Sequence, residues 1–270
     1  MKSAPAESRV AQEFARRAAR AESLAPGSPA AEEPLRFAAG LYRAQGETAA
    51  ALEALHARHS LTGRIAEDAG AVLESATPVL RHAAEGGPDA LSEEAGGRRE
   101  EDREVARTRL VVWWAGDRPS TEDYLSRAIL RPYVELLRTL AIAPERVHAR
   151  GSCPVCGGKP WISARREGSL TEGARRMLGC ALCGLEWPFE RIRCASCFEE
   201  DPYKLPSFRD DKHPAIRIEA CETCRRYVKS IDLSEDARPI PEVDDLASIA
   251  MDLWAAGQGW TRIEPGLAGI

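Results

Sequence analysis

The 270-residue sequence lacks an excess of positive charge, a long apolar run and, throughout its first half, any cysteine. Lys and Arg total 37 and Asp and Glu total 42, which gives a formal net charge of −5. Non-specific nucleic-acid binders and binders of anionic membranes usually carry a positive excess, so the composition argues against both classes. The charge is also evenly spread. Residues 1–150 hold 21 basic and 23 acidic side chains, and residues 151–270 hold 16 and 19.

The sequence also lacks a membrane span and an export signal. Its most apolar run, Leu110-Val-Val-Trp-Trp-Ala-Gly116, has 7 residues, whereas a membrane-spanning helix needs about 20. The first residues contain neither an apolar signal core nor a paired-arginine export pattern. We therefore expect a cytoplasmic chain. In a reducing compartment, clustered cysteines indicate metal or redox chemistry rather than structural disulfides.

The first half predicts helices, and it contains no nucleotide-binding loop, nucleophile elbow or paired-carboxylate helix. Apolar residues recur three and four apart over 34–59 and again over 64–83, as an amphipathic helix requires. Gly46 is a candidate break or kink in the first of these helices. Pro78 is a candidate interruption, or a new first turn, in the second.

A third helix is predicted before the first half ends. The run from Ser120 to Asp123 supplies oxygen caps and acidic side chains for a helix that continues to about Leu140. His56 and His59 have the spacing of a helical metal pair, but no further ligand is near them in sequence, so we interpret them as ordinary surface or half-buried histidines. Residues 1–150 are thus expected to form a helical domain.

All eight cysteines fall in four Cys-x-x-Cys pairs, and none of them precedes residue 153. The pairs are Cys153/Cys156, Cys180/Cys183, Cys194/Cys197 and Cys221/Cys224. A tetrahedral metal ion takes four thiolates at about 2.3 Å, and a two-residue gap lets one tight turn aim two sulfurs at the same ion. We therefore interpret the cysteines as metal ligands rather than as disulfides or free core thiols.

The spacing favours pairing these four Cys-x-x-Cys turns, which we call knuckles, in sequence order. The insert from Cys156 to Cys180 has the same length as the insert from Cys197 to Cys221, whereas the connector between the second pair and the third is less than half as long. The region is thus a tandem repeat of two rubredoxin-like, zinc-ribbon-like units, whose folding depends on the metal. The predicted ligands are Cys153, Cys156, Cys180 and Cys183 for site 1, and Cys194, Cys197, Cys221 and Cys224 for site 2. Nested or interleaved pairing remains compatible with the sequence.

The two units differ at the residue that follows each knuckle. Gly157 and Gly184 follow the knuckles of the first unit, and glycine readily adopts the positive φ that closes such a turn. Phe198 and Arg225 stand at those places in the second unit. We expect the second unit to be looser or to be held by packing, and we hypothesise that its metal is the more labile one.

The ligand set leaves the metal open. Four thiolates suit zinc and mononuclear iron equally. Zinc would make the sites structural, and iron would permit one-electron chemistry. A Cys-x-x-Cys redox pair usually begins a helix in a thioredoxin-like unit, and no such unit is visible here.

Helical patterning returns after the cysteine region. The segment DDLASIAMDLWAAGQGW starts with two acidic residues at 244 and 245 and predicts one closing helix that ends near Gly257 or Gly259. The expected class is therefore α+β, with a helical domain (1–150), a first metal module (151–190), a second metal module (191–235) and a C-terminal helix that packs back on the rest (236–270).

Four runs of this sequence resemble the FdhE family, the formate dehydrogenase accessory proteins. They are CPVCGGKPWISARREG, RRMLGCALCGLEWPFERIRCASC, ACETCRRYVKSIDL and VDDLASIAMDLWAAGQGWTR. Their order and spacing are similar to the family's across 153–262. Two earlier runs, EPLRFAAGLYRAQ and RPYVELLRTLA, are similar to family helices more weakly.

This resemblance implies a cytoplasmic factor that binds the catalytic subunit of a respiratory formate dehydrogenase before the subunit is exported. Such a factor is needed for the dehydrogenase to become active and is not itself an enzyme. The resemblance also carries over motif residues beside the cysteines, which are Glu186, Trp187, Arg191, Tyr227 and Lys229, with Asp244 and Asp245 at the last helix. We expect the first five to include partner-binding residues, since Trp, Tyr and Arg often carry affinity. The alternatives are that Trp187 packs between the two modules, that Arg191 pairs with a local acid and that the two aspartates are helix-start acids.

Two other functions remain open. One is an iron-binding redox protein that transfers electrons or senses redox state. The other is a zinc-ribbon nucleic-acid binder, for which the pairs Arg165/Arg166, Arg175/Arg176 and Arg225/Arg226 offer basic side chains. The acidic balance of residues 151–270 counts against nucleic acid, and each divalent tetrathiolate would add about two negative charges.

Overall fold

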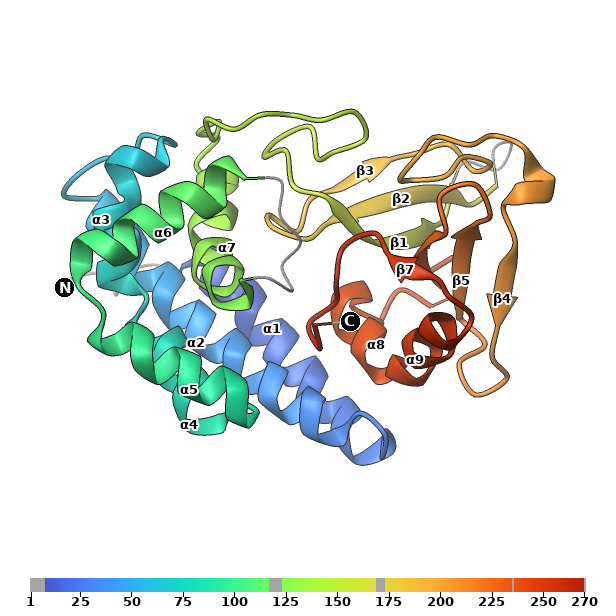
Figure 1. The fold of residues 1–270 in the computed structure, drawn as a ribbon, viewed down its shortest axis with the longest axis horizontal. Helices are drawn as coiled ribbons and strands as arrows, with labels where there is room; N and C mark the ends of the chain where they lie inside the picture. Colours follow the sequence, from blue (N-terminus) through green and yellow to red (C-terminus); the bar gives the residue numbers. More distant parts are fainter. Residues whose placement is uncertain (1–7, 117–122, 169–172, 235, 270) are drawn as a thin grey trace, which may run out of the picture. The chain divides into compact units, whose positions relative to one another are not determined.

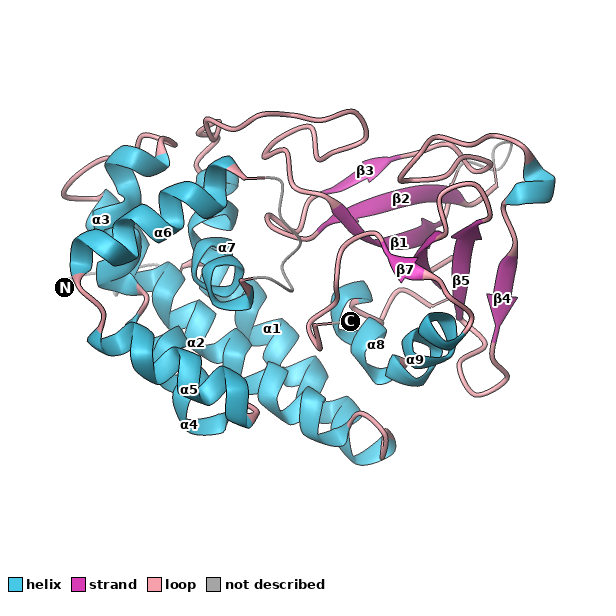
Figure 2. Cartoon of the chain, in the orientation of Figure 1, coloured by secondary structure: helices cyan, strands magenta, loops and turns pink. Residues whose placement is uncertain are grey.

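The computed structural model describes residues 8–116, 123–168, 173–234 and 236–269. Contacts divide the chain into two compact units, one built mainly from residues up to Val147 and the other mainly from His148 onward. Figure 2 shows that the first is helical and that the strands belong to the second. Within the described residues, no helix combines the length and the apolar character that crossing a bilayer requires.

Seven α-helices make up most of the first unit in the described part of the chain (Figure 1). They are α1 (Arg9–Leu24), α2 (Glu32–His56), α3 (Ile65–Ser75), α4 (Thr77–Gly86), α5 (Asp89–Glu100), α6 (Arg103–Ala115) and α7 (Tyr124–Thr139), with a short 3₁₀ turn, η1 (Ala25–Gly27), after α1. Pro78 stands in the first turn of α4, so it begins a new helix, as one of the two sequence interpretations held. Gly46 does not break α2, because the helix runs through it to His56.

Helix α7 is buried along nearly its whole length. The Asp123 side chain caps it by accepting a hydrogen bond from the Ser126 backbone N–H at 2.9 Å, as the helix-start signal predicted. The rest of that signal, residues 120–122, lies outside the described residues. Within α7, Glu135 accepts bonds from Arg17 at 2.9 and 3.0 Å and from Arg131 at 2.9 Å. This buried ionic cluster fixes α7 against α1.

One seven-stranded sheet organises the described part of the second unit, in the order β3-β2-β1-β6-β5-β4, with β7 on β6. The strands are β1 (Pro160–Arg166), β2 (Arg175–Cys180), β3 (Glu186–Pro188), β4 (Ser207–Arg209), β5 (Ile216–Cys221), β6 (Arg226–Asp232) and β7 (Thr261–Arg262), and a 3₁₀ turn, η2 (Pro202–Lys204), precedes β4. Each metal module contributes an antiparallel group, β1–β2–β3 and β4–β5–β6. The fold is therefore α+β with two ribbon-like modules, as expected.

The two groups join through a parallel pairing of β1 with β6, in which Ile162 lies opposite Lys229. The predicted module boundaries at 190/191 and 235/236 therefore divide the sequence but not the sheet. The strands of these segments form one continuous sheet. The C-terminal segment differs from the expected single helix. It forms α8 (Pro241–Ala247) and α9 (Ile249–Gly257), with Ser248 between them. Met251 and Ala255 of α9 belong to the apolar core of the sheet.

Candidate metal centres

The eight cysteines form two separate clusters, with the sequential pairing that the spacing favoured. Cys153, Cys156, Cys180 and Cys183 make one cluster and Cys194, Cys197, Cys221 and Cys224 the other. All sulfurs of a cluster lie within 4.8 Å of one another. Within the described residues, His56 and His59 belong to no metal-binding group. His56 instead accepts a hydrogen bond from the Leu61 N–H through Nδ1 at 3.0 Å.

The geometry of both clusters fits a tetrahedral ion. Metal–sulfur bonds of about 2.3 Å place tetrahedral sulfurs about 3.8 Å apart. In site 1, Cys153 and Cys183 have sulfurs 3.6 Å apart, and Cys156 and Cys180 have sulfurs 3.4 Å apart. In site 2, the matching separations are 3.7 Å and 3.6 Å. Each cluster can therefore hold one metal ion, and the thiolate donors suit iron and zinc alike.

Backbone N–H groups support the sulfurs. The N–H groups of Leu182 and Cys183 donate to Sγ of Cys180 at 3.3 and 3.4 Å. The same arrangement recurs in site 2, where Ser196 and Cys197 donate to Sγ of Cys194 at 3.3 and 3.4 Å. These donors lower the energy of a thiolate, whereas burial raises the pKa of the Cys194 thiol. A bound cation would stabilise the thiolates further.

The residue after each knuckle has the positive φ that the turn requires. It is 68° at Gly157 and 65° at Gly184. Phe198 and Arg225 adopt the same conformation at 66° and 54°, although each carries a Cβ.

Packing holds these two side chains of site 2. The Arg150 guanidinium lies 4.2 Å from the centroid of the Phe198 ring. The guanidinium of Arg225 lies 3.7 Å from the centroid of Trp260 and donates to the Gln258 carbonyl at 2.8 Å. The second unit is therefore held by side-chain packing, one of the two forms that the sequence predicted.

The two sites differ in exposure. All four cysteines of site 1 are buried, whereas in site 2 Cys197 is exposed and Cys224 is partly exposed. Solvent, chelators and oxidants therefore reach the second site more readily.

Three of the predicted partner-binding residues lie around the metal modules with solvent access. Glu186 and Trp187 are on the edge strand β3, and Arg166 pairs with Glu186 at 2.5 and 2.7 Å. Trp187 is partly buried against a small core that joins Leu178 of the first module to Ala195 of the second. This is the position that the packing alternative required. Arg191 is exposed.

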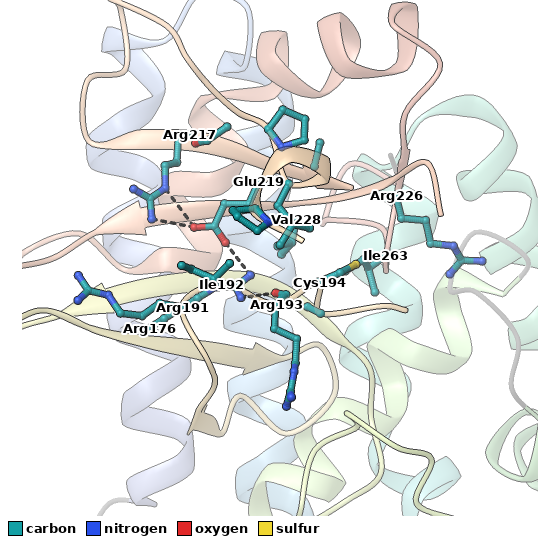
Figure 3. A pocket seen from close by; sticks show the side chains of 16 residues that line it. Arg176, Arg191, Ile192, Arg193, Cys194, Arg217, Glu219, Arg226, Val228 and Ile263 are labelled. Carbon is teal, nitrogen blue, oxygen red and sulfur yellow. Dashed lines mark hydrogen bonds and ion pairs between the residues drawn. The ribbon is translucent and has the colours of Figure 1, made fainter. Parts of the chain in front are cut away.

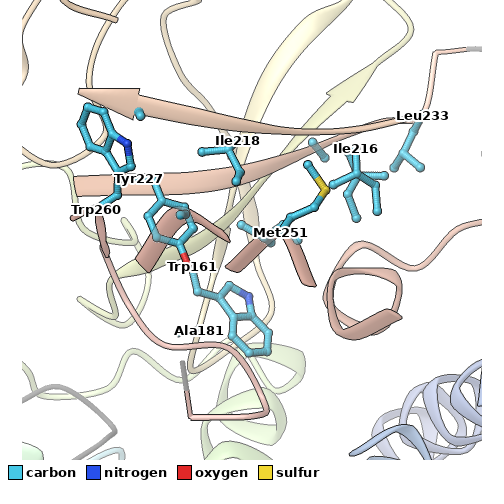
Figure 4. Close-up of a cluster of buried hydrophobic side chains, with 13 residues drawn as sticks. Trp161, Ala181, Ile216, Ile218, Tyr227, Leu233, Met251 and Trp260 are labelled. Carbon is cyan, nitrogen blue, oxygen red and sulfur yellow. The ribbon is translucent and has the colours of Figure 1, made fainter. Parts of the chain in front are cut away.

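Tyr227 and Lys229 lie inside the fold, on the face of β6 beneath α8 and α9. They are 3% and 0% exposed. The Tyr227 hydroxyl donates to Asp252 at 2.8 Å, and Lys229 Nζ lies 2.5 Å from the same carboxylate. Figure 4 shows the Tyr227 ring within the apolar cluster of the sheet. Direct partner contact at these two positions stays a prediction, and both side chains are too buried to belong to an exposed docking surface.

Lys229 belongs to a buried ionic network that the sequence did not reveal. Arg262 donates to Asp245 at 2.7 Å, to Asp252 at 3.2 Å and to the Trp161 carbonyl at 2.9 Å. Burial raises the pKa of Asp252. Burial would also raise the pKa of Asp245, but the positive charges of Arg262 and Lys229 outweigh it and lower that pKa. Two cations thus meet two carboxylates in the buried interior of the unit.

The two aspartates at 244 and 245 have different roles. Asp244 accepts a hydrogen bond from the Ile240 N–H at 2.8 Å, at the start of α8, which suits a helix-start acid. Asp245 points into the ionic network instead. Single-sequence reasoning could have suspected the network only from Asp, Lys and Arg residues within otherwise apolar segments.

A pocket lies beside site 2, between the connector that enters Cys194 and the strands β5 and β6 (Figure 3). Its volume is about 210 Å³. Five arginines and one acidic residue line it, namely Arg176, Arg191, Arg193, Arg217, Arg226 and Glu219. The connector of the tandem repeat therefore also shapes a basic hollow next to a metal centre.

The family models that match this chain fall on the two metal modules and the C-terminal segment. The family model described as "FdhE, central domain" matches residues 152–191, and the one described as "FdhE, C-terminal domain" matches residues 192–267. Among curated relatives, a protein FdhE homolog of Aquifex aeolicus is 34% identical over 151 residues, which cover 54% of this chain and 53% of that protein. A homolog of Pseudomonas aeruginosa is 37% identical over 123 residues, which cover 44% of this chain and 40% of that protein.

The matched segments thus span about half, or less, of the curated relatives. A solved structure extends the likeness. The crystal structure of the FdhE protein from Pseudomonas aeruginosa matches with a TM-score of 0.67 at 27% identity, and the match covers 95% of both chains. Because the family models fall on both metal centres and the structural match takes in the helical unit as well, this chain is similar to FdhE proteins over nearly its whole length.

Proposed function

We propose that this protein is an assembly factor that binds the catalytic subunit of a respiratory formate dehydrogenase and is needed for that enzyme's activity. Similarity to FdhE proteins, with the family models matching the two four-cysteine clusters, is the observation that carries the proposal. We place this action in the cytoplasm, where the catalytic subunit would be met before export. The partner comes from the family resemblance.

The ligand sets support a role without catalysis at the metals. Four protein thiolates complete a tetrahedral shell and leave no open position for a substrate. The metal, when bound, would supply folding energy to strands too short to build a core alone. The cysteines, their N–H donors and the sheet would hold the protein in the form that binds its partner.

The proposal can be tested by an activity measurement in cells and a binding measurement with purified proteins. We expect a strain without this protein to lose formate dehydrogenase activity, and the purified, metal-loaded chain to bind the purified catalytic subunit. A Cys153→Ser, Cys183→Ser double variant should fail in both assays, whereas Ser152→Ala beside them should act as wild type. Circular dichroism and metal content show whether the double variant keeps the helical unit. Normal dehydrogenase activity in the deletion strain would refute the proposal.

A second candidate function is favoured by the exposed thiol of Cys197 in site 2. An iron ion there would lie close enough to the surface to exchange electrons or to respond to an oxidant. Metal analysis with an absorption spectrum, on protein purified without oxygen, separates the two functions. About two zinc ions per chain and no visible bands would restrict the function to partner binding. Ferric-thiolate absorption would add a redox step.

A further inference from the structure

The basic pocket beside site 2, which we call the arginine pocket, has a central ion triad. Arg176 is 6% exposed and bonds Glu219 at 2.7 Å, and it donates to the carbonyls of Glu190 and Arg193 at 3.0 and 2.8 Å. Arg217 donates to the other oxygen of Glu219 at 2.8 Å. Figure 3 shows this single carboxylate between two guanidinium groups. The two guanidinium groups and the single carboxylate of this triad therefore have a net charge of +1.

The positive excess persists when a metal occupies site 2. Five arginines line the pocket, and Glu219 is the acidic residue among them. A divalent ion with four thiolates would carry about two negative charges. Among the lining groups alone, five positive charges against one carboxylate and about two charges from the site leave an excess of about two, before Glu190 and Glu200, the partners of Arg193, are counted. The arginines thus exceed what the neighbouring metal centre would neutralise.

Two of these arginines are available to a ligand. Arg191 and Arg226 are exposed, and the part of the chain that the structure describes shows neither an ion pair nor a side-chain hydrogen bond for either of them. Arg193 differs, because it pairs with Glu190 and Glu200. Several other exposed arginines of this protein also pair with an acid, as Arg238 does with Asp236. Both unpaired arginines line the hollow.

The remaining lining is apolar and partly exposed. Ile192 is 59% exposed, and Leu205, Pro206 and Val228 continue the surface inward. Tyr203, which follows the lining residue Pro202, is 94% exposed. A small anion could satisfy the arginines but would leave Ile192 and Tyr203 in water. A peptide that carries both carboxylates and apolar side chains would cover both kinds of surface.

We propose that the arginine pocket docks an acidic peptide segment of the partner subunit. Carboxylates of that segment would pair with Arg191 and Arg226, and its apolar side chains would lie against Ile192 and Leu205. This inference rests on the proposed function and names the chemistry of the partner's contact. It also gives Arg191 an acidic partner that the described residues do not supply, and it makes binding sensitive to the shape of the second metal module.

Charge reversal tests the proposal on the full-length, metal-loaded chain. We expect Arg191→Glu and Arg226→Glu each to weaken binding to the purified catalytic subunit at least tenfold, with a shallower dependence of the dissociation constant on salt. Arg238→Glu is the matched control, because it changes the net charge equally at a side chain that is 87% exposed and away from the pocket. It should change the affinity less than twofold. Equal effects of all three variants, or none, would overturn the proposal.

A direct probe separates this proposal from the proposed function. If the wild-type chain does not bind the catalytic subunit, the proposed function fails. The pocket is then judged with a short synthetic peptide of alternating aspartate and leucine and its asparagine counterpart. Binding of the aspartate peptide alone, lost in Arg191→Glu, supports the pocket. Binding of neither peptide overturns it. If inorganic phosphate binds and the aspartate peptide does not, the pocket is a small-anion site and the peptide proposal is wrong.

Discussion

At the scale of single residues, Lys229 is the side chain whose surroundings differ most from what its type suggests. Lysine is rarely fully buried unless it is paired. Lys229 has no exposed surface. It contacts Asp252 at 2.5 Å, Asp245 at 3.1 Å and the Ser248 hydroxyl at 3.0 Å. These contacts tie β6 to both C-terminal helices, so the family motif residue has a structural position inside the unit.

We predict that Lys229→Met destabilises the protein by about 3–5 kcal/mol, because it leaves Asp245 and Asp252 with one cation between them in a buried interior. Urea unfolding of the metal-loaded protein measures the change. Lys212→Met is the control, since Lys212 is exposed, and it should shift stability by less than about 0.5 kcal/mol. A small effect of Lys229→Met would mean that water reaches the network.

Glycine at the knuckle positions gives a second residue-scale prediction. Gly157→Ala should destabilise the metal-loaded protein by about 1–2 kcal/mol, because φ at this position is 68° and a Cβ disfavours it. Gly96→Ala is the matched control. Gly96 lies inside α5, and none of the described atoms lies within 4 Å of the place that a Cβ would take, so this substitution should stabilise the protein by about 0.5–1 kcal/mol. Thermal unfolding followed by circular dichroism compares the two, and equal signs would contradict the strain argument.

Residues that act locally could be predicted from sequence, whereas residues that act through tertiary contact could not. Asp123 and Pro78 mark helix starts by local chemistry, so the structure confirms both. Gly46 suggested a break by its own propensity, but a Cβ there would lie 3.5 Å from atoms of Ala11 and Phe14. The packing of α1 on α2 outweighs that propensity. The partners of Lys229 lie 16 and 23 positions away, beyond any local pattern.

At the scale of elements, the first turn of α7 buries a phenol without a bonded partner. The Tyr124 hydroxyl has no hydrogen-bond partner within the described residues. Burial raises its pKa from 10.0 to about 12. The unfolded chain therefore loses this proton from pH 10 upward, while the folded chain keeps it until about pH 12. The folded state is stabilised below pH 10 and loses that contribution as the pH rises to 12.

We predict that wild type loses on the order of 2 kcal/mol of stability between pH 10 and 12 through this group, and that Tyr124→Phe removes that loss. Tyr203→Phe serves as control, because Tyr203 is 94% exposed in the folded chain. Guanidinium unfolding at several pH values compares the three proteins. The same pH dependence in Tyr124→Phe and wild type would show that the phenol is hydrated.

The elements of the metal region were predictable for a different reason. The two inserts of equal length indicated how the knuckles pair, and the clusters confirm it. The parallel pairing of β1 with β6 was not predictable. The alternation of apolar and polar residues along a strand does not specify which strand of another module it pairs with. The closing helix divides at Ser248, whose buried side chain bonds the Asp245 carbonyl and Lys229. That contact also exists only in the folded unit.

At the scale of the whole molecule, the two metal centres should not behave alike. We predict that a chelator removes the ion of site 2 first, because Cys197 is exposed and Cys224 partly exposed, whereas every cysteine of site 1 is buried. A metallochromic dye should record two phases of release. Cys197→Ser should abolish the fast phase, and Cys156→Ser should abolish the slow one. Loss of the slow phase in Cys197→Ser would reverse the assignment.

The pairing of β1 with β6 sets an order of events during translation. Ile162 pairs with Lys229, and Lys229 leaves the ribosome only after the cysteines of both sites have been synthesised. Until then β1 has a neighbour on one side only, β2, and site 1 already has all its cysteines. We predict that nascent chains arrested after β3 but before Cys221 protect the site 1 thiols from alkylation in the presence of zinc but not the thiols of site 2, which then lacks two of its ligands. Cys221 and Cys224 come just before β6, so the second ion is acquired as the sheet closes, and until then a ribosome-bound chain is half metallated.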